Sequence, residues 1–185
     1  MKELSLNILD ITENSVKAGA LLTEITLTEN EEILTVSIKD DGCGMTPEIL
    51  NSVTNPFYTT RTTRKVGLGI PLFKMSAEQT GGSLEITSKT ADEKDGSHGT
   101  LLVATYYKKH LDFTPLGDVI STLITLIQGH PDVDFLFIHK NEEKEVRLDT
   151  RELKAILSPV PLNTYEVLLW IEENLREQYS EFNKK

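Results

Sequence analysis

The N-terminal half of the chain alternates between helix-like and strand-like patterns of apolar side chains. Apolar residues recur at helical spacing from Leu4 to Val16, which predicts an amphipathic helix that ends before Gly19 and Ala20. The segments "LLTEITLT" and "EILTVSIKD" instead alternate apolar and polar residues on either side of a polar turn at residues 29–31. This alternation is typical of strands with one buried face, so we expect a β-hairpin whose second strand ends at "DDGCGM".

A short helix, a longer helix and two more strands are predicted next. Thr46 is a candidate cap for "TPEIL", with Pro47 at the first helical position. Residues 51–67 have little apolar periodicity and are expected to form a loop that leads into a helix from Leu68 to about Gln79. A Gly-Gly pair ends this helix, and "SLEITSK" and "GTLLVATYYK" are expected to be strands.

The tail of the chain predicts a further, smaller set of elements. A helix is expected in "LGDVISTLITLIQG", strands in "VDFLFIHK" and "EVRLD", and helices in "RELKAIL" and "TYEVLLWIEENLREQYSEF". We therefore expect two domains, residues 1–110 and a small α/β unit of residues 111–185 with no assigned role. The small unit is interpreted as a core packed on the first domain, and a partner-docking surface that includes Trp170 is the alternative.

The charge of the chain narrows the classes of partner. The formal net charge is −10 and the sequence pI is near 4.9. Both parts are acidic, with 11 Lys and Arg against 15 Asp and Glu up to His110, and 8 against 14 after it. Nucleic acids and anionic membranes attract basic surfaces, so neither is expected as a partner.

The cysteine content and the N-terminus favour a cytoplasmic protein. Cys43 is the single cysteine, which excludes an internal disulfide framework and a cysteine-rich zinc site. The first residues lack the apolar core of a signal peptide, and no apolar run is long enough to span a bilayer.

A polar stripe on the first predicted helix is the first candidate for chemistry. Asp10, Asn14 and Lys17 share one face at helical spacing, and Asn7 extends the stripe by one turn. One interpretation is a solvated edge in which Glu13 and Lys17 form an exposed pair. The other interpretation is a site for a metal ion and phosphates.

Two glycine-containing segments are the next candidates. In "DDGCGM", Asp40 ends a strand, and Gly42 and Gly44 allow the backbone to approach a flat ligand. The Asp40 carboxylate could accept a hydrogen bond from an amine of that ligand. In "KVGLGIPLF", Gly67 and Gly69 flank a helix start whose free amides could hold an anion. Each motif alone is also compatible with an ordinary turn.

The order of these segments resembles the GHKL superfamily, which includes gyrase-type topoisomerases, heat-shock chaperone ATPases, histidine kinases and MutL mismatch-repair ATPases. The resemblance covers roughly residues 4–108. "DITENSVKAGA" and "IKDDGCGM" are most similar to MutL proteins, and "NPFYTTRTTRKVGLGIPLFKMSAEQTGGSLEITSK" is similar to the histidine-kinase catalytic domain. The resemblance implies an α+β two-layer sandwich, in which a mixed, mainly antiparallel sheet carries helices on one face and binds ATP with Mg²⁺.

The resemblance also implies roles for individual residues. Asn14 would coordinate Mg²⁺, Asp10 would occupy the position of the catalytic base, and Lys17 would face the phosphates. Asp40 would bind adenine. The remaining predicted nucleotide contacts are Gly42, Gly44, Met45 and Thr100 near adenine, and Arg61, Lys65, Gly67, Leu68 and Gly69 near the phosphates.

Two departures from the family pattern leave the activity open. Asp10 is one methylene shorter than the usual Glu, and none of the four histidines is followed by an acidic residue, so a self-contained histidine kinase is not expected. One hypothesis is an enzyme that slowly hydrolyses ATP or phosphorylates a Ser or Thr of a partner. The other is a regulatory module that ATP binding switches without turnover. Both predict a protein partner, and both are compatible with a homodimer.

Overall fold

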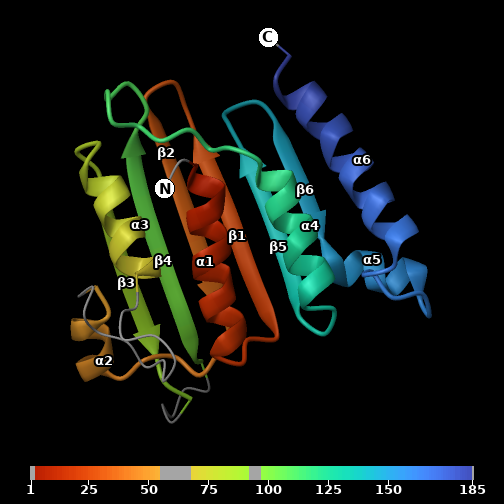
Figure 1. Ribbon diagram of the computed structural model, residues 1–185, viewed down its shortest axis with the longest axis horizontal. Coiled ribbons are helices and arrows are strands. Elements are labelled where there is room, and N and C mark those ends of the chain that lie inside the picture. Colours follow the sequence, from red (N-terminus) through yellow and green to blue (C-terminus); the bar gives the residue numbers. More distant parts are fainter. Residues whose placement is uncertain (1–2, 55–67, 92–96, 185) are drawn as a thin grey trace.

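The computed structural model describes residues 3–54, 68–91 and 97–184, and their strands form one open sheet (Figure 1). The six strands lie in the order β3-β4-β2-β1-β5-β6. The strands are β1 (Leu22–Glu29), β2 (Ile33–Asp40), β3 (Ser83–Lys89), β4 (Gly99–Tyr107), β5 (Asp134–Lys140) and β6 (Glu145–Asp149). The helices are α1 (Leu4–Lys17), α2 (Pro47–Ser52), α3 (Gly69–Glu78), α4 (Val119–Gly129), α5 (Thr150–Leu157) and α6 (Tyr165–Phe182).

The predicted hairpin is formed by β1 and β2. The two strands pair antiparallel, from Thr23 opposite Asp40 to Glu29 opposite Leu34. The Asn30 side chain fixes the turn because its oxygen accepts hydrogen bonds from the backbone N–H groups of Glu32 and of the residue that follows it. Alternate residues of both strands are buried, as the apolar-polar alternation predicts.

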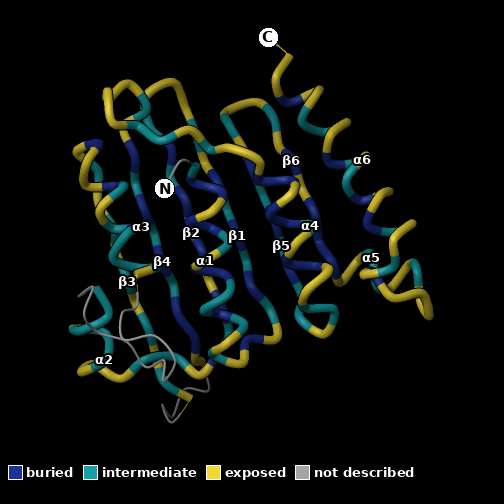
Figure 2. Tube along the Cα trace, viewed as in Figure 1, coloured by how far each residue is buried: buried dark blue, intermediate teal, exposed yellow. Residues whose placement is uncertain are grey.

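The helices cover one face of the sheet and enclose a single core. Helices α3, α1 and α4 lie across that face, while α6 packs against α4 and β6 (Figure 1). The buried segments of strands and helices face each other across this layer (Figure 2). The core includes Ile8, Ile11, Ile25, Val36, Phe73, Leu102, Leu123, Phe137, Ile171 and Leu175. The α+β sandwich with helices on one face is therefore confirmed.

The tail adds two strands to this same sheet. Strand β5 pairs parallel to β1, with Leu22 opposite Asp134 and Thr28 opposite Lys140, and β6 pairs antiparallel to β5. Helix α4 packs on α1, where the Thr122 hydroxyl donates to a backbone carbonyl of α1 at 3.3 Å. The residues on the two sides of the boundary predicted at residue 110 thus share one sheet and one core.

A chain of polar contacts also joins the tail to β1. The Lys108 ammonium lies 2.5 Å from one Glu29 oxygen, and Nε2 of His139 lies 3.2 Å from the other as an ion-pair contact rather than a well-aligned hydrogen bond. Nδ1 of His139 lies 2.9 Å from the Tyr179 hydroxyl on α6. The approach of His139, assisted by Lys108, outweighs partial burial and lowers the pKa of the Glu29 carboxyl to about 2.

We expect residues 1–110 not to fold as an independent domain. Removing residues 111–185 would leave β1 with an unpaired edge and expose apolar side chains of α1 that α4 covers. Thermal unfolding followed by circular dichroism should be cooperative for the 185-residue chain and non-cooperative for the fragment. A fragment that unfolds cooperatively within a few degrees of the full chain would support the two-domain division instead.

The Glu29 contacts should make stability depend on pH under acidic conditions. Because the carboxyl pKa is lower in the folded chain, its stabilising contribution is complete above the ordinary glutamate pKa of 4.5 and is lost as the pH falls toward about 2. Denaturant unfolding between these pH values should show a smaller pH dependence for Glu29→Gln than for the parent chain. Glu24→Gln, at an exposed surface ion pair, is the control and should retain the parent slope.

Candidate functional site

A buried carboxylate marks the end of the sheet where β2 ends and β4 begins. Asp40 is only 7% exposed and lies opposite Thr100 in the sheet. Its Oδ2 accepts a hydrogen bond from the Ser15 hydroxyl at 2.8 Å, and its Oδ1 accepts from the N–H groups of Gly42 at 3.0 Å and Thr100 at 3.1 Å. A carboxylate has about four acceptor positions, so Oδ2 retains capacity for one more donor.

Glycines allow the backbone to pass closely around this carboxylate. Gly44 has φ +69°, and a Cβ there would lie 1.8 Å from the Lys89 carbonyl oxygen. Gly99 has φ +121°, and a Cβ there would lie 1.9 Å from the carbonyl oxygen of Asp40. A side chain at either position would therefore displace a neighbouring strand as well as strain the backbone.

A hydroxyl pair links the glycine loop to β4. The Ser88 hydroxyl accepts from the Met45 N–H at 2.8 Å, donates to the Gly99 carbonyl at 3.0 Å and lies 2.9 Å from the Thr100 hydroxyl. Met45, one of the predicted contacts near adenine, is half-buried at this loop. Ser88 therefore helps to hold both Met45 and Thr100 beside Asp40.

The polar stripe of α1 lies beside the Asp40 site, except for Asn7. Asp10 and Lys17 are exposed and Asn14 is half-buried, with the Lys17 ammonium 3.5 Å from Glu13. Asn7 is 3% exposed, and its amide donates to the Ser76 hydroxyl of α3 at 3.2 Å. The stripe that Asn7 was expected to extend is therefore not a solvated edge at this position, because the Asn7 side chain packs between two helices.

The first turn of α3 meets the same stripe. A Cβ at Gly69 would lie 3.5 Å from the Asn14 side-chain nitrogen and 3.8 Å from Cβ of Asp10. No described side chain caps the start of α3, where Leu68 is half-exposed. The helix start therefore presents backbone N–H groups and a positive dipole end close to Asn14 and Asp10.

Three predicted nucleotide contacts lie outside the described residues, and two residues that form hydrogen bonds in the site were not predicted from the sequence. Arg61, Lys65 and Gly67 lie outside the described residues. Ser15 and Ser88 were not predicted, although both make hydrogen bonds within the site. For Ser15, the signal in the sequence is a polar residue on the buried flank of α1, adjacent to Asn14.

Two kinds of feature are missing from the described part of the chain. Residues 3–54, 68–91 and 97–184 contain no group of three or more His, Cys, Asp or Glu side chains placed to hold a metal ion. None of the described helices combines the length and the apolar character that a membrane crossing requires.

The family to which the chain belongs is shown by a match over residues 1–108 to the model described as histidine kinase-, DNA gyrase B- and HSP90-like ATPase. The chain belongs to this ATPase family. This match confirms the resemblance noted in the sequence, and family membership supports ATP binding.

One curated relative and two solved structures extend the comparison. Sensor protein SrrB of Staphylococcus aureus is 37% identical over 94 residues, which cover 48% of this chain and only 16% of SrrB. The ADP complex of the Aquifex aeolicus MutL ATPase domain has a TM-score of 0.55 at 16% identity, covering 96% of this chain and 70% of that one. The N-terminal domain of a DNA repair protein has a TM-score of 0.56 at 16% identity, covering 86% and 58%. These two likenesses show the fold alone.

We expect Asp40→Asn to weaken ATP binding at least tenfold. Replacing one carboxylate oxygen by an amide removes a charge-assisted acceptor and sets a donor against the adenine amine, a loss of roughly 1.5–3 kcal/mol. Isothermal titration of ATP into the variant and the parent chain measures this loss, with circular dichroism as the check on folding. Glu85→Gln, on the exposed face of β3, is the matched control. Equal affinity of Asp40→Asn and the parent would remove Asp40 from the nucleotide site.

Proposed function

We propose that the chain binds ATP with Mg²⁺ at the Asp40 end of the sheet and uses it for slow hydrolysis or for phosphorylation of a Ser or Thr on a partner protein. The observation that carries this proposal is the Asp40 carboxylate, which is buried, held by three donors and left with one acceptor position. We further propose a cytoplasmic location, because ATP is supplied there.

Asp40 favours adenine over guanine. Adenine presents an exocyclic amine, which donates a hydrogen bond, where guanine presents a carbonyl oxygen, which accepts one. Asp40 as a carboxylate only accepts, so it pairs with the amine and repels the carbonyl. The hydroxyl of Ser15 and the amides of Gly42 and Thr100 donate to this carboxylate and hold its orientation.

The phosphates fit between α1 and the start of α3. Asn14 offers an amide oxygen of the kind that Mg²⁺ prefers, and the N–H groups near Gly69 suit an anion. When bound, Mg²⁺ offsets phosphate charge and ATP supplies a γ-phosphoryl group that a water or hydroxyl oxygen can attack. Asp10 lies one turn before Asn14 on the exposed face of α1, where it can orient that nucleophile and take its proton.

An ATP-gated regulatory module is the second candidate. The short side chain of Asp10 favours it, because Asp10 has one methylene fewer than the usual Glu and reaches less far toward a nucleophile. The chain spans only 16% of the length of SrrB, so the whole activity of that relative does not transfer. In this alternative, ATP binding would alter an interface without turnover.

A time course with γ-labelled ATP and Mg²⁺ separates these candidates when it counts both free phosphate and label on protein. If the chain is an enzyme, we expect it to release free phosphate or to label a protein, and we expect Asp40→Asn to abolish this signal. Asp10→Asn should lower the rate by about 10² or more and change ATP affinity only a few-fold. ATP binding without phosphate release or label, by the chain alone and with added partner protein, would favour the regulatory module.

A further inference from the structure

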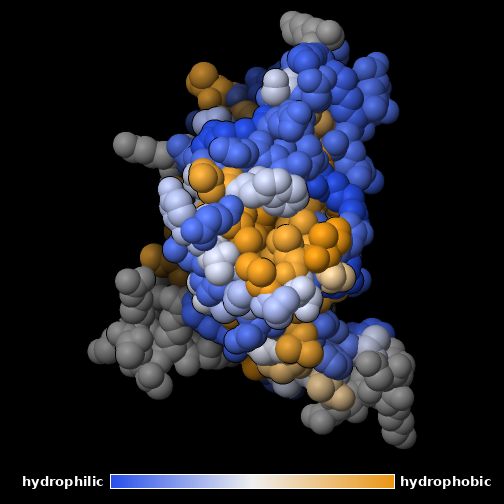
Figure 3. All heavy atoms as spheres, turned by 90° about the vertical axis from the view of Figure 1, so that its right-hand side faces the viewer, coloured by the Kyte–Doolittle hydropathy of each residue, from blue (hydrophilic) through white to orange (hydrophobic). Residues whose placement is uncertain are grey.

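An exposed apolar patch lies on the tail, away from the nucleotide end of β2. Figure 3 shows it as a contiguous apolar area with a polar surround on the side of the molecule that carries α5 and α6. We define the α5–α6 surface by five exposed apolar side chains: Ile156 (77% exposed), Val160 (47%), Tyr165 (75%), Leu169 (42%) and Trp170 (51%). Contiguous apolar areas of this kind on a folded chain mark interaction sites.

These side chains have no role in the core. Helix α6 already buries Leu168, Ile171 and Leu175 on the face that packs against the sheet. A helix needs one apolar face for that purpose, yet Leu169 and Trp170 lie outside that face and are exposed. Their exposure therefore calls for another explanation.

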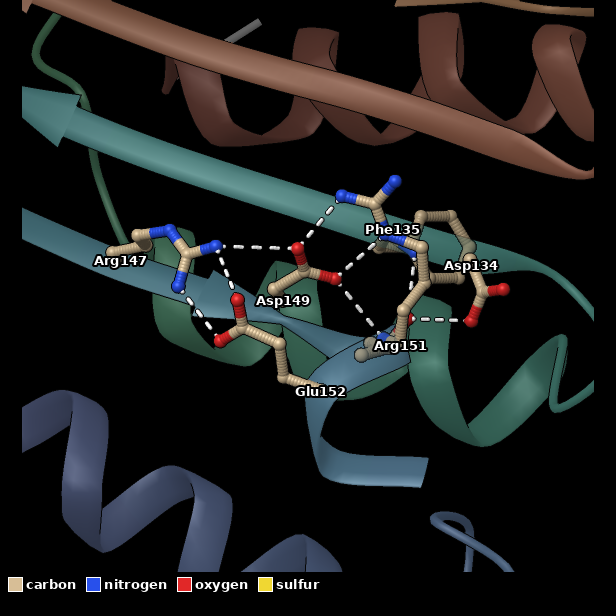
Figure 4. A network of polar contacts seen from close by, with 7 residues as sticks. Asp134, Phe135, Arg147, Asp149, Arg151 and Glu152 are labelled. Atoms are coloured by element: carbon tan, nitrogen blue, oxygen red, sulfur yellow. Dashed lines mark hydrogen bonds and ion pairs between the residues drawn. The ribbon is translucent and has the colours of Figure 1, made fainter. Parts of the chain in front are cut away.

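The surface rests on a fixed support at the start of α5. Figure 4 shows Asp149 receiving hydrogen bonds from the backbone and the guanidinium of Arg151, while Arg147 binds Glu152 through two nitrogens at 2.8 Å. The Thr150 hydroxyl donates to Asp134 and accepts from a backbone N–H of β5. Because these bonds tie α5 to β5 and β6, they hold the part of the surface that α5 carries, with Ile156, in a fixed position.

The charges around Trp170 are negative and unmatched. Glu166, Glu173 and Glu177 are exposed and lie four residues before, three after and seven after Trp170, so they share its helical face. None of the three forms an ion pair with a cation of the described chain, whereas Arg176 is paired with Glu172 at 2.6 Å. An apolar area edged by unpaired carboxylates is complementary to a surface that combines apolar and basic side chains.

We propose that the α5–α6 surface binds a partner protein through an amphipathic segment whose apolar stripe is flanked by Lys or Arg. The apolar stripe would cover Leu169, Trp170 and Ile156, and the basic residues would meet the three carboxylates. In the sheet, β1 and β5 separate β6 from β2, so this inference does not depend on nucleotide binding.

A second copy of the chain fits this surface poorly. Two α6 helices packed antiparallel through Trp170 would bring Glu166 of one copy near Glu173 of the other, which sets carboxylate against carboxylate. The net charge of −10 adds repulsion between whole chains.

The test uses the fluorescence of Trp170, which is the only tryptophan in the chain. The probes are two synthetic, tryptophan-free helical peptides of about 18 residues, one built from Leu and Lys and the other from Leu and Glu on the same helical pattern. Without nucleotide, the Leu/Lys peptide should shift the Trp170 emission to shorter wavelength and bind at least tenfold more tightly than the Leu/Glu peptide. Added salt should reduce this difference.

Variants separate specific docking from general adhesion. Ile156→Ser with Leu169→Ser should weaken Leu/Lys binding at least tenfold, and Leu111→Ser, at a 97% exposed apolar residue outside the surface, should leave it unchanged. Replacing Glu166, Glu173 and Glu177 by Gln should remove the preference for Lys over Glu. Equal binding of the two peptides, or an equal effect of Leu111→Ser, would overturn the proposal. A dimer that sedimentation detects in the parent chain but not in the Ile156→Ser, Leu169→Ser variant would also overturn the proposal, because the surface would then bind a second copy.

Discussion

A buried carboxylate costs several kcal/mol unless its oxygens are hydrogen-bonded, and Asp40 meets this condition by drawing three segments together. The hydroxyl of Ser15 comes from α1, the N–H of Gly42 from the turn after β2, and the N–H of Thr100 from the start of β4. If any of these segments moved away, the charge would remain buried with fewer partners. The bond from Ser15 therefore helps to hold α1 over this end of the sheet, and the same carboxylate fixes the geometry of the candidate adenine site.

The close backbone approaches around Asp40 follow from the same requirement. Thr100 can reach the carboxylate only if the preceding residue passes within contact of the Asp40 carbonyl, and Gly99 permits this because it has no Cβ. Gly44 permits a similar approach to β3, which places the Ser88 hydroxyl within reach of the Met45 N–H. The glycines of this site are thus needed for the packing of strands and loop before any ligand is considered.

Short-range signals in the sequence predicted most of the elements, but long-range pairing was not accessible. The β1–β2 hairpin and the cap of α2 at Thr46 depend on residues close in sequence, and both were predicted. The parallel pairing of β5 with β1 joins segments about a hundred residues apart, and alternation within β5 does not specify its neighbour. The bond from Ser15 to Asp40 was missed for the same reason, since it requires α1 to lie over the end of β2. Asp40 itself was identifiable because its motif is local.

The tail matters to the candidate site because it fixes the helix that carries Asn14. Helix α1 is tied at both ends to the residues that flank α4: the Leu4 N–H donates to the Pro115 carbonyl before α4 at 3.0 Å, and Glu13 lies 2.7 Å from Nε2 of His130, which follows α4. Glu13 is the neighbour of Asn14, and α4 in turn packs against α6. A ligand that shifts α1 must therefore either carry α4 with it or break these contacts. The shared sheet and these contacts make the tail a structural support of the candidate phosphate site, although it supplies none of the predicted nucleotide contacts.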